Sequence, residues 1–486
     1  MIARLKDLLF VNRGEKQTII KNVFWLSMSQ IGSRLFRAII LIYAARVLGA
    51  AEYGILSYVL GLAAFFTIFA DIGVSPLMTR DVAAHPEKRN EYFSSSFLIK
   101  IFLLLITILL IIFIAPYFAK IEKAKYLIPF VAFLVIFDGI RDFAVAYWRG
   151  REKMEFETIT VMIMNITIMV AGFAALNIFP TSGALLFSYI ASVGIAAFLS
   201  IFLLWKRFSK IFFYFDKNLI REILNNCWPI ALLGMIGTFM LNTDIIMLGW
   251  WRTAEEIGYY SAGQRIVGLL YTLPALIASS VFPTISRLIK QNDKEKIRML
   301  NEKSISAIFS IAIPLVIGGI ILAQPLIELF FGQEYIPAIA SFKILIFTVL
   351  LTFPGSIISN LTTAYNQQKK IFHYVVLGAL GNVVFNAILI PLYGISGAAI
   401  ATIASQSIFY GLIWRHIKKI DDFSTLKHLK KIIAAAVIMG IFSSTLNKLE
   451  LNVIINIIIS SGIYFGALYL LKEDIILEIK SLIKKI

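Results

Sequence analysis

Long apolar segments, separated by short polar connections, run through the whole chain. Each contains about 20 or more consecutive, mostly apolar residues, which is the length that an α-helix needs to cross a bilayer. We therefore predict about fourteen transmembrane helices. They lie near residues 19–45, 53–79, 92–118, 126–148, 158–179, 182–205, 222–250, 256–286, 304–327, 336–365, 371–392, 395–414, 432–446 and 452–471.

The first apolar segment carries a polar stripe. In SMSQIGSRLFR, Ser27, Gln30, Arg34 and Arg37 recur at helical spacing among apolar residues, so they share one helix face. At 1.5 Å per residue, the two arginines lie roughly 20 Å or more from the inner end of this helix. A charge near the bilayer centre is costly, about 2.5–3.5 kcal/mol on insertion scales, and such residues usually face a bundle interior or an aqueous cavity. The stripe predicts an anion-binding cavity.

Composition supports the membrane class, because 59% of the 486 residues are hydrophobic and only 15% are charged, whereas soluble domains carry about 25% charged residues. The single cysteine excludes an internal disulfide and a cysteine-based zinc cluster. The four histidines are scattered without metal-ligand spacing, so we expect no metal and no cofactor.

The net charge of +17 is explained by topology. Most lysines and arginines lie in the terminal tails and the even-numbered connections. The odd-numbered connections hold only Arg46, Lys120, Lys123, Lys125, Arg252 and Lys448. This asymmetry predicts a multi-pass protein of the cytoplasmic membrane with both termini in the cytoplasm. The basic residues then attract anionic membrane lipids, and no nucleic-acid partner is expected.

Two halves of the chain resemble each other. The turn RVLGAAEYGILSY (46–58) returns as IMLGWWRTAEEIGYYSA (246–262), and Ser-Gly-Ala opens both the sixth and the twelfth segment. An even number of spans separates the copies, so they have the same orientation, as in transporters built from parallel repeats. We predict an N-lobe (1–210, helices 1–6), a C-lobe (211–420, helices 7–12) and two additional helices (421–486).

Acidic residues also lie within the apolar segments. Asp71 in the second segment is the nearest acid in sequence to the arginines, but the helical rise places it roughly 10 Å below Arg34. The fourth segment carries Asp138, Arg141 and Asp142 on one face. These residues form either a structural ion-pair network or a site where a carboxylate exchanges H⁺ or Na⁺ for substrate.

The second half lacks the arginine stripe, because Gly234 and Gly237 occupy the matching positions. Arg265 in the eighth segment is the third candidate anion contact. Asp244 and Lys343 lie at similar predicted depth and are expected to form a structural latch, with a ligand or ion-coupling site as the alternative.

The opening of the chain, with its R-x-LG-x-x-x-YG turn and D-x-G-x-x-x-x-x-x-R-D ending (Asp71, Gly73, Arg80 and Asp81), resembles the polysaccharide flippases of the O-antigen and teichoic-acid type. These belong to the multidrug/oligosaccharidyl-lipid/polysaccharide exporter superfamily. The resemblance implies an all-α polytopic membrane protein with two six-helix lobes around a central cavity. It also implies transport of an isoprenoid-pyrophosphate-linked oligosaccharide by alternating access.

The resemblance and the stripe together predict a transporter rather than an enzyme. Arg34 and Arg37, assisted by Arg265 and Gln30, would bind the pyrophosphate, because arginine binds such anions with paired donors. Membrane lipids and enzymes of glycan assembly are the further expected partners. Two alternatives stay open: a cation-coupled multidrug antiporter of the same superfamily, which the six basic residues within the segments disfavour, and a glycan polymerase or ligase, which the short connections disfavour.

Overall fold

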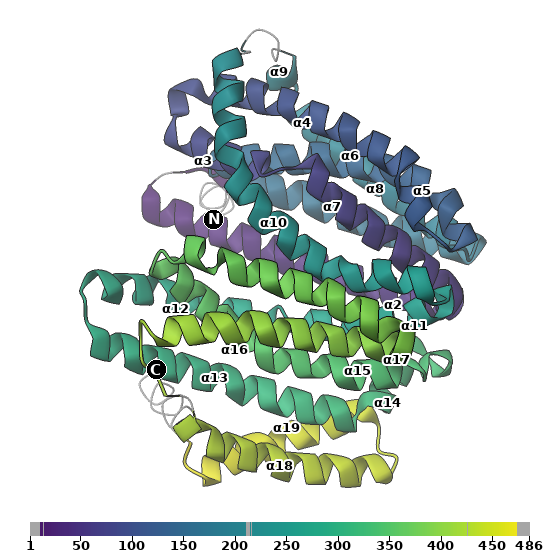
Figure 1. The fold of residues 1–486 in the computed structure, drawn as a ribbon, viewed down its shortest axis with the longest axis vertical. Helices are drawn as coiled ribbons and strands as arrows, with labels where there is room; N and C mark the ends of the chain where they lie inside the picture. The colour runs from purple at the N-terminus through teal and green to yellow at the C-terminus, as the bar shows by residue number, and fades with distance from the viewer. Residues whose placement is uncertain (1–9, 13, 210–213, 215, 425, 474–486) are drawn as a thin grey trace, which may run out of the picture. The chain divides into compact units, whose positions relative to one another are not determined.

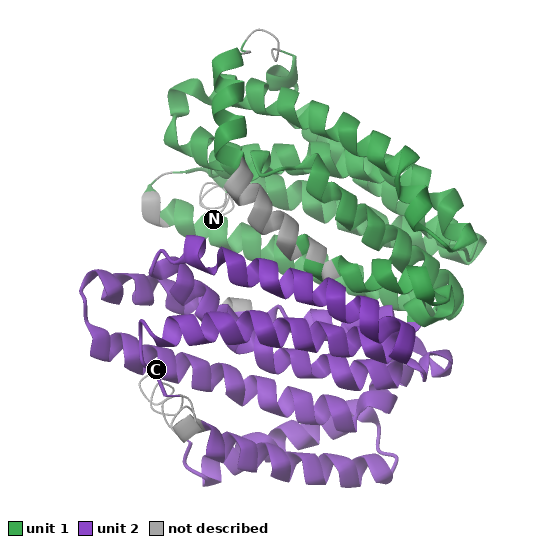
Figure 2. Ribbon diagram, viewed as in Figure 1, with its two compact units in different colours: residues 1–258 green, residues 259–486 purple. Residues whose placement is uncertain are grey.

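The computed structural model describes the chain except for residues 1–9, 13, 210–213, 215, 425 and 474–486. The described residues form α-helices, short 3-10 turns and connections, with no strand (Figure 1). The chain divides into two compact units, residues 1–258 and 259–486 (Figure 2).

Unit 1 begins with the long helix α2 and ends within α11. Its helices are α2 (Glu15–Ala70), α3 (Val74–Ala84), α4 (Arg89–Phe113), α5 (Ala115–Phe118), α6 (Glu122–Gly150), α7 (Met154–Ile178), α8 (Ser182–Leu203), α9 (Trp205–Phe208), α10 (Lys217–Trp251) and α11 (Ala254–Leu270). Unit 2 contains α12 (Leu273–Lys290), α13 (Lys294–Ile321), α14 (Ala323–Phe331), α15 (Ala338–Leu345), α16 (Val349–Ala364), α17 (Gln368–Lys418), α18 (Leu426–Lys448) and α19 (Val453–Leu470).

Each predicted apolar segment lies in one of these helices or in two consecutive ones. Two neighbouring segments share α2 and two share α17, because a non-helical glycine turns the chain inside each. Gly49 has φ 72° and Gly394 has φ 59°, which is backbone that glycine adopts without a steric penalty. By length and composition, nine helices of the described residues can cross a membrane, two of them being these merged pairs. The helical membrane fold is confirmed, and the count of fourteen spans stays a prediction.

Within unit 1, helix α2 packs against α4, α6, α7, α8 and α10. Beside it, an aromatic cluster joins α4 to α6. The ring of Phe93 lies 5.2 Å from that of Phe143 and 4.9 Å from that of Tyr147, and all three side chains are buried. Such ring pairs contribute about 0.5–1.5 kcal/mol beyond their buried area. The cluster therefore fixes α6, which carries the acidic residues described below.

The repeated turn brings α2 and α11 into close backbone contact. A Cβ atom added to Gly54 would lie 1.7 Å from the backbone oxygen of Ala254, and one added to Gly258 would lie 2.0 Å from that of Ala50. The two contacts exchange corresponding positions of the two sequence copies, as a local twofold relation requires. Glycine is needed at both positions, because any side chain would push the helices apart.

In unit 2 the final helix pair, α18 and α19, packs against α13. Asn456 of α19 donates to the backbone oxygen of Ser443 at 3.0 Å and accepts from the hydroxyl groups of Ser443 and Ser460. The hydroxyl group of Tyr464 donates to the backbone oxygen of Ser310 at 2.7 Å. Buried polar contacts of this kind replace the missing hydrophobic driving force between helices in lipid. The lobe boundaries at 210 and 420 stay a prediction.

A buried carboxyl group after α17 leads to a prediction about pH. Burial raises the pKa of Asp421, although Asn301 donates a hydrogen bond to it. The side-chain oxygen of Asn301 is itself buried and has no hydrogen-bond partner in the described part of the chain. A raised carboxyl pKa means that the folded state favours the protonated form, so this stabilisation is present at low pH and is lost as the pH rises through the folded pKa.

We therefore expect Asp421→Asn to raise the free energy of unfolding at pH 7 by about 1 kcal/mol, because the amide removes the charge and donates to the free oxygen of Asn301. This increase in the free energy of unfolding becomes smaller toward pH 4. The melting temperature of both proteins in detergent, at pH 7 and at pH 4, tests the expected difference. Asp422→Asn, which removes the same charge from an exposed neighbour, is the control. An equal gain in the control, or a gain that does not depend on pH, contradicts the assignment.

Candidate functional site

The first half of α2 has three distinct faces. Ser29, Ile40 and Ala44 lie on a buried face, which packs on α7. The second face is apolar and exposed, and consists of Phe24, Met28, Ile31, Leu35 and Ile39. The third face is polar and exposed and carries the predicted stripe, Ser27, Gln30, Arg34 and Arg37. In a membrane the apolar exposed face suits lipid, whereas the polar one requires water or a polar ligand.

Arg37 is positioned by a hydrogen-bond chain to α7. Its Nε donates to the side-chain oxygen of Asn165 at 3.2 Å, and Asn165 Nδ2 donates to Ser33 Oγ at 3.2 Å and to the backbone oxygen of Val161 at 2.7 Å. Asn165 is only 1% exposed. The amide contact uses one of the five N–H donors of Arg37, so the other donors stay available for an anion.

Arg34 lies one turn before Arg37 on the same exposed face. Neither arginine forms an ion pair with a carboxylate among the described residues. Asp71, the acid nearest to them in the sequence, forms no ion pair with Arg34 among the described contacts. In the described part of the chain, the two adjacent guanidinium groups therefore have no ion-pair partner.

Asp71 instead pairs with a residue to which the sequence analysis gave no role. Lys100 Nζ of α4 lies 2.8 Å from Asp71 Oδ2, and the side chain of Lys100 is 2% exposed. Asp71 follows the end of α2 and also accepts hydrogen bonds from the backbone N–H (3.2 Å) and the hydroxyl group of Ser75, in the first turn of α3. Asp71 thus joins α2, α3 and α4.

The charged residues of α6 form an ion-pair network, and its role in ion coupling stays a prediction. Arg141 Nη2 lies 2.8 Å from Asp138 Oδ1 and 2.6 Å from Asp142 Oδ1. Its Nη1 contacts the sulfur of Met164 on α7. The Arg141 side chain is 9% exposed, whereas those of Asp138 and Asp142 are 31% and 52% exposed. The two carboxylates are therefore partly exposed at the polar surface, whereas the arginine that pairs with them is buried.

The stripe and the α6 network belong to one electrostatic cluster, because the charges of Arg37 and Lys100 both act on Asp138. Asp71 pairs with Lys100, whereas Asp138 and Asp142 share Arg141. With Arg34 and Arg37 included, four basic residues stand against three acids, so the cluster has a formal charge of +1. The arrangement therefore favours an anionic ligand over a cationic one.

The other predicted residues lie apart from this cluster. Asp244 of α10 is buried in unit 1, whereas Lys343 of α15 and Arg265 of α11 are exposed residues of unit 2. The relative position of the two units is not determined. The latch between Asp244 and Lys343, and a role of Arg265 beside the α2 arginines, therefore stay predictions.

Sequence reasoning missed two residues of the cluster, Lys100 and Asn165. Both are single polar residues within apolar helices, IKIFLLLI and VMIMNITIM, so the same search that found Arg34 could have identified them. It also missed the buried pair of Lys21 and Glu155, whose charged atoms lie 3.0 Å apart and which joins α2 to α7. Neither partner lies in the middle of an apolar run, so that pair has no clear sequence signature.

An all-helical membrane scaffold with charged residues in the middle of its helices defines the class of multi-span transporters. Within that class the chain belongs to the polysaccharide biosynthesis protein family, whose model matches residues 19–289. A second model, MatE, matches residues 229–392.

Curated relatives match over most of their length. The probable low-salt glycan biosynthesis flippase Agl15 of Haloferax volcanii is 23% identical over 466 residues, covering 94% of each chain. A putative O-antigen transporter of Shigella flexneri is 26% identical over 422 residues, covering 79% of this chain and 94% of that one.

The fold is similar to that of solved transporters. The lipid II flippase MurJ in its inward closed conformation aligns with a TM-score of 0.76 at 19% identity, covering 93% of this chain and all of that one. An inward-facing multidrug resistance transporter of the MATE family aligns with a TM-score of 0.65 at 14% identity, covering 83% of this chain and all of that one. These likenesses confirm the predicted fold class.

Proposed function

We propose that this protein is a flippase that moves an isoprenoid-pyrophosphate-linked oligosaccharide from the inner to the outer leaflet of the cytoplasmic membrane, for surface polysaccharide biosynthesis. The observation that carries the proposal is the pair of exposed arginines on α2, which have no carboxylate partner among the described residues. The relatives named as a glycan biosynthesis flippase and an O-antigen transporter support the same cargo class.

The chemistry of the cargo fits this site. A pyrophosphate is a compact dianion or trianion with several acceptor oxygens, and arginine binds such groups with two parallel N–H donors. Arg34 and Arg37 supply two planar guanidinium groups from adjacent turns of one helix. Gln30, one turn earlier on the same exposed face, offers an amide to the first sugar. Arg265 is the proposed contact from the second unit.

Transport by alternating access requires that the protein release the bound pyrophosphate of the cargo. The Asp138–Arg141–Asp142 network lies close enough to Arg37 for its charge to change the attraction that the cargo experiences. We propose that loss of H⁺ or Na⁺ from one of these acids is the coupling event, because the restored negative charge weakens the attraction of Arg37 for the pyrophosphate. Enzymes of glycan assembly at the inner leaflet, and later at the outer leaflet, are the proposed functional partners.

The antiporter alternative requires carboxylates free to bind a cationic drug. In the α2–α6 cluster each acid has a basic partner, so the charge balance disfavours that cargo. A polymerase or ligase would be an enzyme, whereas the named relatives and structural neighbours are flippases and transporters.

Reconstitution tests the proposed cargo directly. Proteoliposomes that contain the full chain are loaded with a fluorescent polyprenyl-pyrophosphate N-acetylglucosamine, and a membrane-impermeant quencher reports the outer leaflet. We expect flipping at least tenfold faster than in protein-free liposomes for the pyrophosphate. A polyprenyl-monophosphate sugar should be flipped more slowly, because it presents fewer acceptor oxygens to Arg34 and Arg37.

Phosphatidylcholine of the same label is the matched control lipid in this assay. Equal rates for all three lipids would indicate unselective scrambling and contradict the proposal. Export of a cationic dye without any flipping of the pyrophosphate lipid would favour the antiporter instead.

A further inference from the structure

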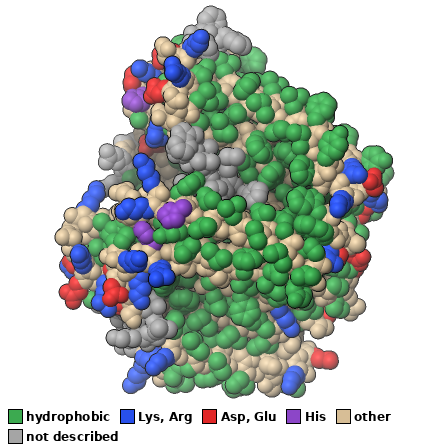
Figure 3. Space-filling model, in the orientation of Figure 1, with side chains coloured by type: hydrophobic (Ala, Val, Ile, Leu, Met, Phe, Trp, Pro, Cys, Tyr) green, Lys and Arg blue, Asp and Glu red, His purple; other side chains and the backbone are tan. Residues whose placement is uncertain are grey.

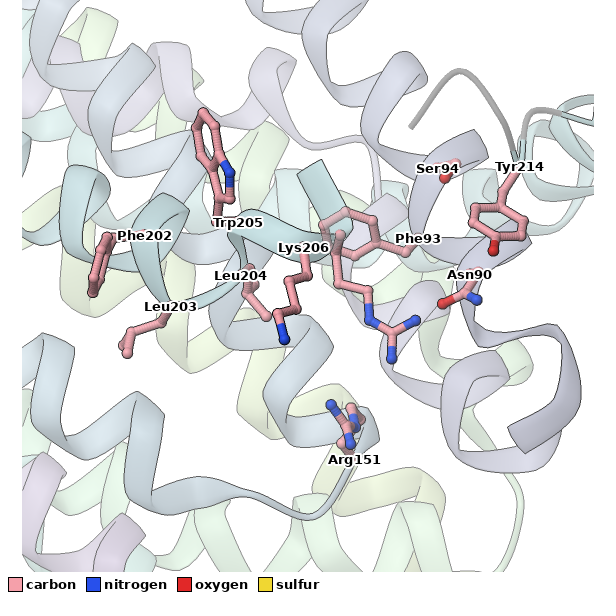
Figure 4. Close-up of a pocket in the computed structure, with 11 residues that line it drawn as sticks. Asn90, Phe93, Ser94, Arg151, Phe202, Leu203, Leu204, Trp205, Lys206 and Tyr214 are labelled. Atoms are coloured by element: carbon pink, nitrogen blue, oxygen red, sulfur yellow. The ribbon is translucent and has the colours of Figure 1, made fainter. Parts of the chain in front are cut away.

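A cavity of about 580 Å³ lies beside α9 in unit 1, and Figure 4 shows the residues that line it. Its walls come from the start of α4, the connection between α6 and α7, the end of α8, and α9. These are the connections whose basic residues predict a cytoplasmic location. The cavity therefore lies at the level of the membrane surface and not at the transport site.

Among the described residues that line this cavity, three are cationic and none is acidic. They are Arg151, Lys206 and Arg207, and Figure 4 shows Lys206 and Arg151 turned toward the same space. The guanidinium group of Arg151 is held over the ring of Tyr147, 5.8 Å from its centroid. None of the three forms an ion pair with a carboxylate among the described residues. Such a group of unpaired cations attracts a phosphate.

The wall beside these cations is apolar and open. Phe202 and Trp205 are 77% and 63% exposed, at the last turn of α8 and the start of α9. Exposed aromatic side chains next to lysine and arginine are typical of the membrane interface, where the ring contacts acyl chains and the cation contacts head groups. In the orientation of Figure 3, too, lysine and arginine gather near helix ends beside broad hydrophobic surfaces.

The cavity is built on a rigid support. Phe208, the last residue of α9, packs its ring 5.2 Å from Phe93 and 4.9 Å from Phe97 of α4. Phe93 is 1% exposed and belongs to the aromatic cluster between α4 and α6. This contact fixes the α9 turn and with it the positions of Lys206 and Arg207. A preorganised site loses less conformational entropy when a ligand binds.

One further group in the wall lacks a partner. The side-chain oxygen of Asn90 is buried and accepts no hydrogen bond from the described residues. A buried acceptor without a donor is unfavourable by about 1–3 kcal/mol. Asn90 therefore adds a polar side chain to the wall that carries the cations.

We propose that this cavity is a binding site for an anionic phospholipid of the adjacent leaflet. The phosphate contacts Arg151, Lys206 and Arg207, and the acyl chains lie along Phe202 and Trp205. The open aromatic wall favours a membrane lipid over a soluble phosphate, which has no apolar part. The bound lipid ties the end of unit 1 to the membrane surface and does not depend on the identity of the transported cargo.

Lipid retention by the purified full chain tests this site. The chain is mixed in detergent with phosphatidylglycerol or phosphatidylcholine, and native mass spectrometry counts the retained lipids. We expect one tightly retained phosphatidylglycerol and no comparable phosphatidylcholine. The Arg151→Gln/Lys206→Gln/Arg207→Gln variant should bind phosphatidylglycerol roughly a hundredfold more weakly, since each interfacial cation contributes about a factor of five to ten.

The matched control is Lys369→Gln/Lys418→Gln/Lys419→Gln, which removes the same charge from exposed positions of unit 2 and should retain the lipid. Lys206→Glu alone changes one exposed side chain and should also weaken retention, which covers the case in which the triple variant fails to fold. Equal retention by both triple variants overturns the proposal. Displacement of phosphatidylglycerol by stoichiometric undecaprenyl pyrophosphate overturns it too, because the cavity would then belong to the cargo.

Discussion

Replacing Arg34 and Arg37 together by alanine is expected to abolish export of surface glycan while the protein remains in the membrane at its normal level. Each guanidinium group supplies charge-assisted hydrogen bonds worth roughly 1.5–3 kcal/mol, or about 10- to 100-fold in cargo affinity. Their removal should leave the fold intact, because neither arginine forms an ion pair in the described part of the chain. Each single variant should reduce export at least tenfold. Surface glycan staining and membrane immunoblots measure both quantities.

Two controls make this result specific. Leu35→Ala changes a side chain that is 59% exposed on the neighbouring apolar face of α2, and it should leave export unchanged. Arg34→Lys/Arg37→Lys keeps both charges but loses the paired donors, so export should fall to an intermediate level. Normal export by the double alanine variant would show that the arginines of α2 are not the cargo-binding site. Equal loss in Leu35→Ala would show that the helix, and not the arginines, is being disturbed.

The second large effect concerns stability. Asp71→Ala should destabilise the protein by about 3–5 kcal/mol, because it leaves the ammonium group of Lys100 buried without its partner. Lys100→Met alone should cost less, since the Asp71 side chain is 22% exposed and keeps its hydrogen bonds from Ser75. The double variant Asp71→Ala/Lys100→Met should recover most of the loss. Thermal unfolding in detergent gives the three values and the coupling between the two sites.

The same variants separate a structural pair from a coupling site. If the double variant is stable and flips its cargo, the pair only holds α2, α3 and α4 together. If it is stable and inactive, Asp71 or Lys100 takes part in the transport cycle. A double variant as unstable as Asp71→Ala would contradict the ion-pair explanation and would point to the bonds between Asp71 and Ser75.

The sequence predicts the helices of this fold well, because the length of each apolar run is set by the membrane and not by neighbouring helices. It could not predict that α2 and α17 continue through a turn, since that depends on the backbone angles of Gly49 and Gly394. The two turn motifs that resemble each other in sequence also meet in the structure, because Gly54 lies against the backbone of Ala254 and Gly258 against that of Ala50.

The candidate site is only partly legible in the sequence. The stripe on α2 and the α6 triad follow from helical periodicity alone, because all members of each group lie on one helix. The pairing of Asp71 with Lys100 does not follow from periodicity, because it depends on the relative height of α2 and α4. Counting residues along one helix places Asp71 at the wrong height for Arg34, but it cannot show that Lys100 from another helix reaches it.

The glycine crossing between α2 and α11 has a consequence for how the protein is made. Ala50 and Gly54 meet partners that are synthesised about 200 residues later, a delay of roughly 10–40 s at 5–20 residues per second. During that interval the first two helical segments lie in the bilayer without the partner that later covers Ala50 and Gly54. The yield of folded protein would therefore depend on whether the membrane insertion machinery shields this surface until the eighth segment is inserted. This dependence is separate from any effect on transport.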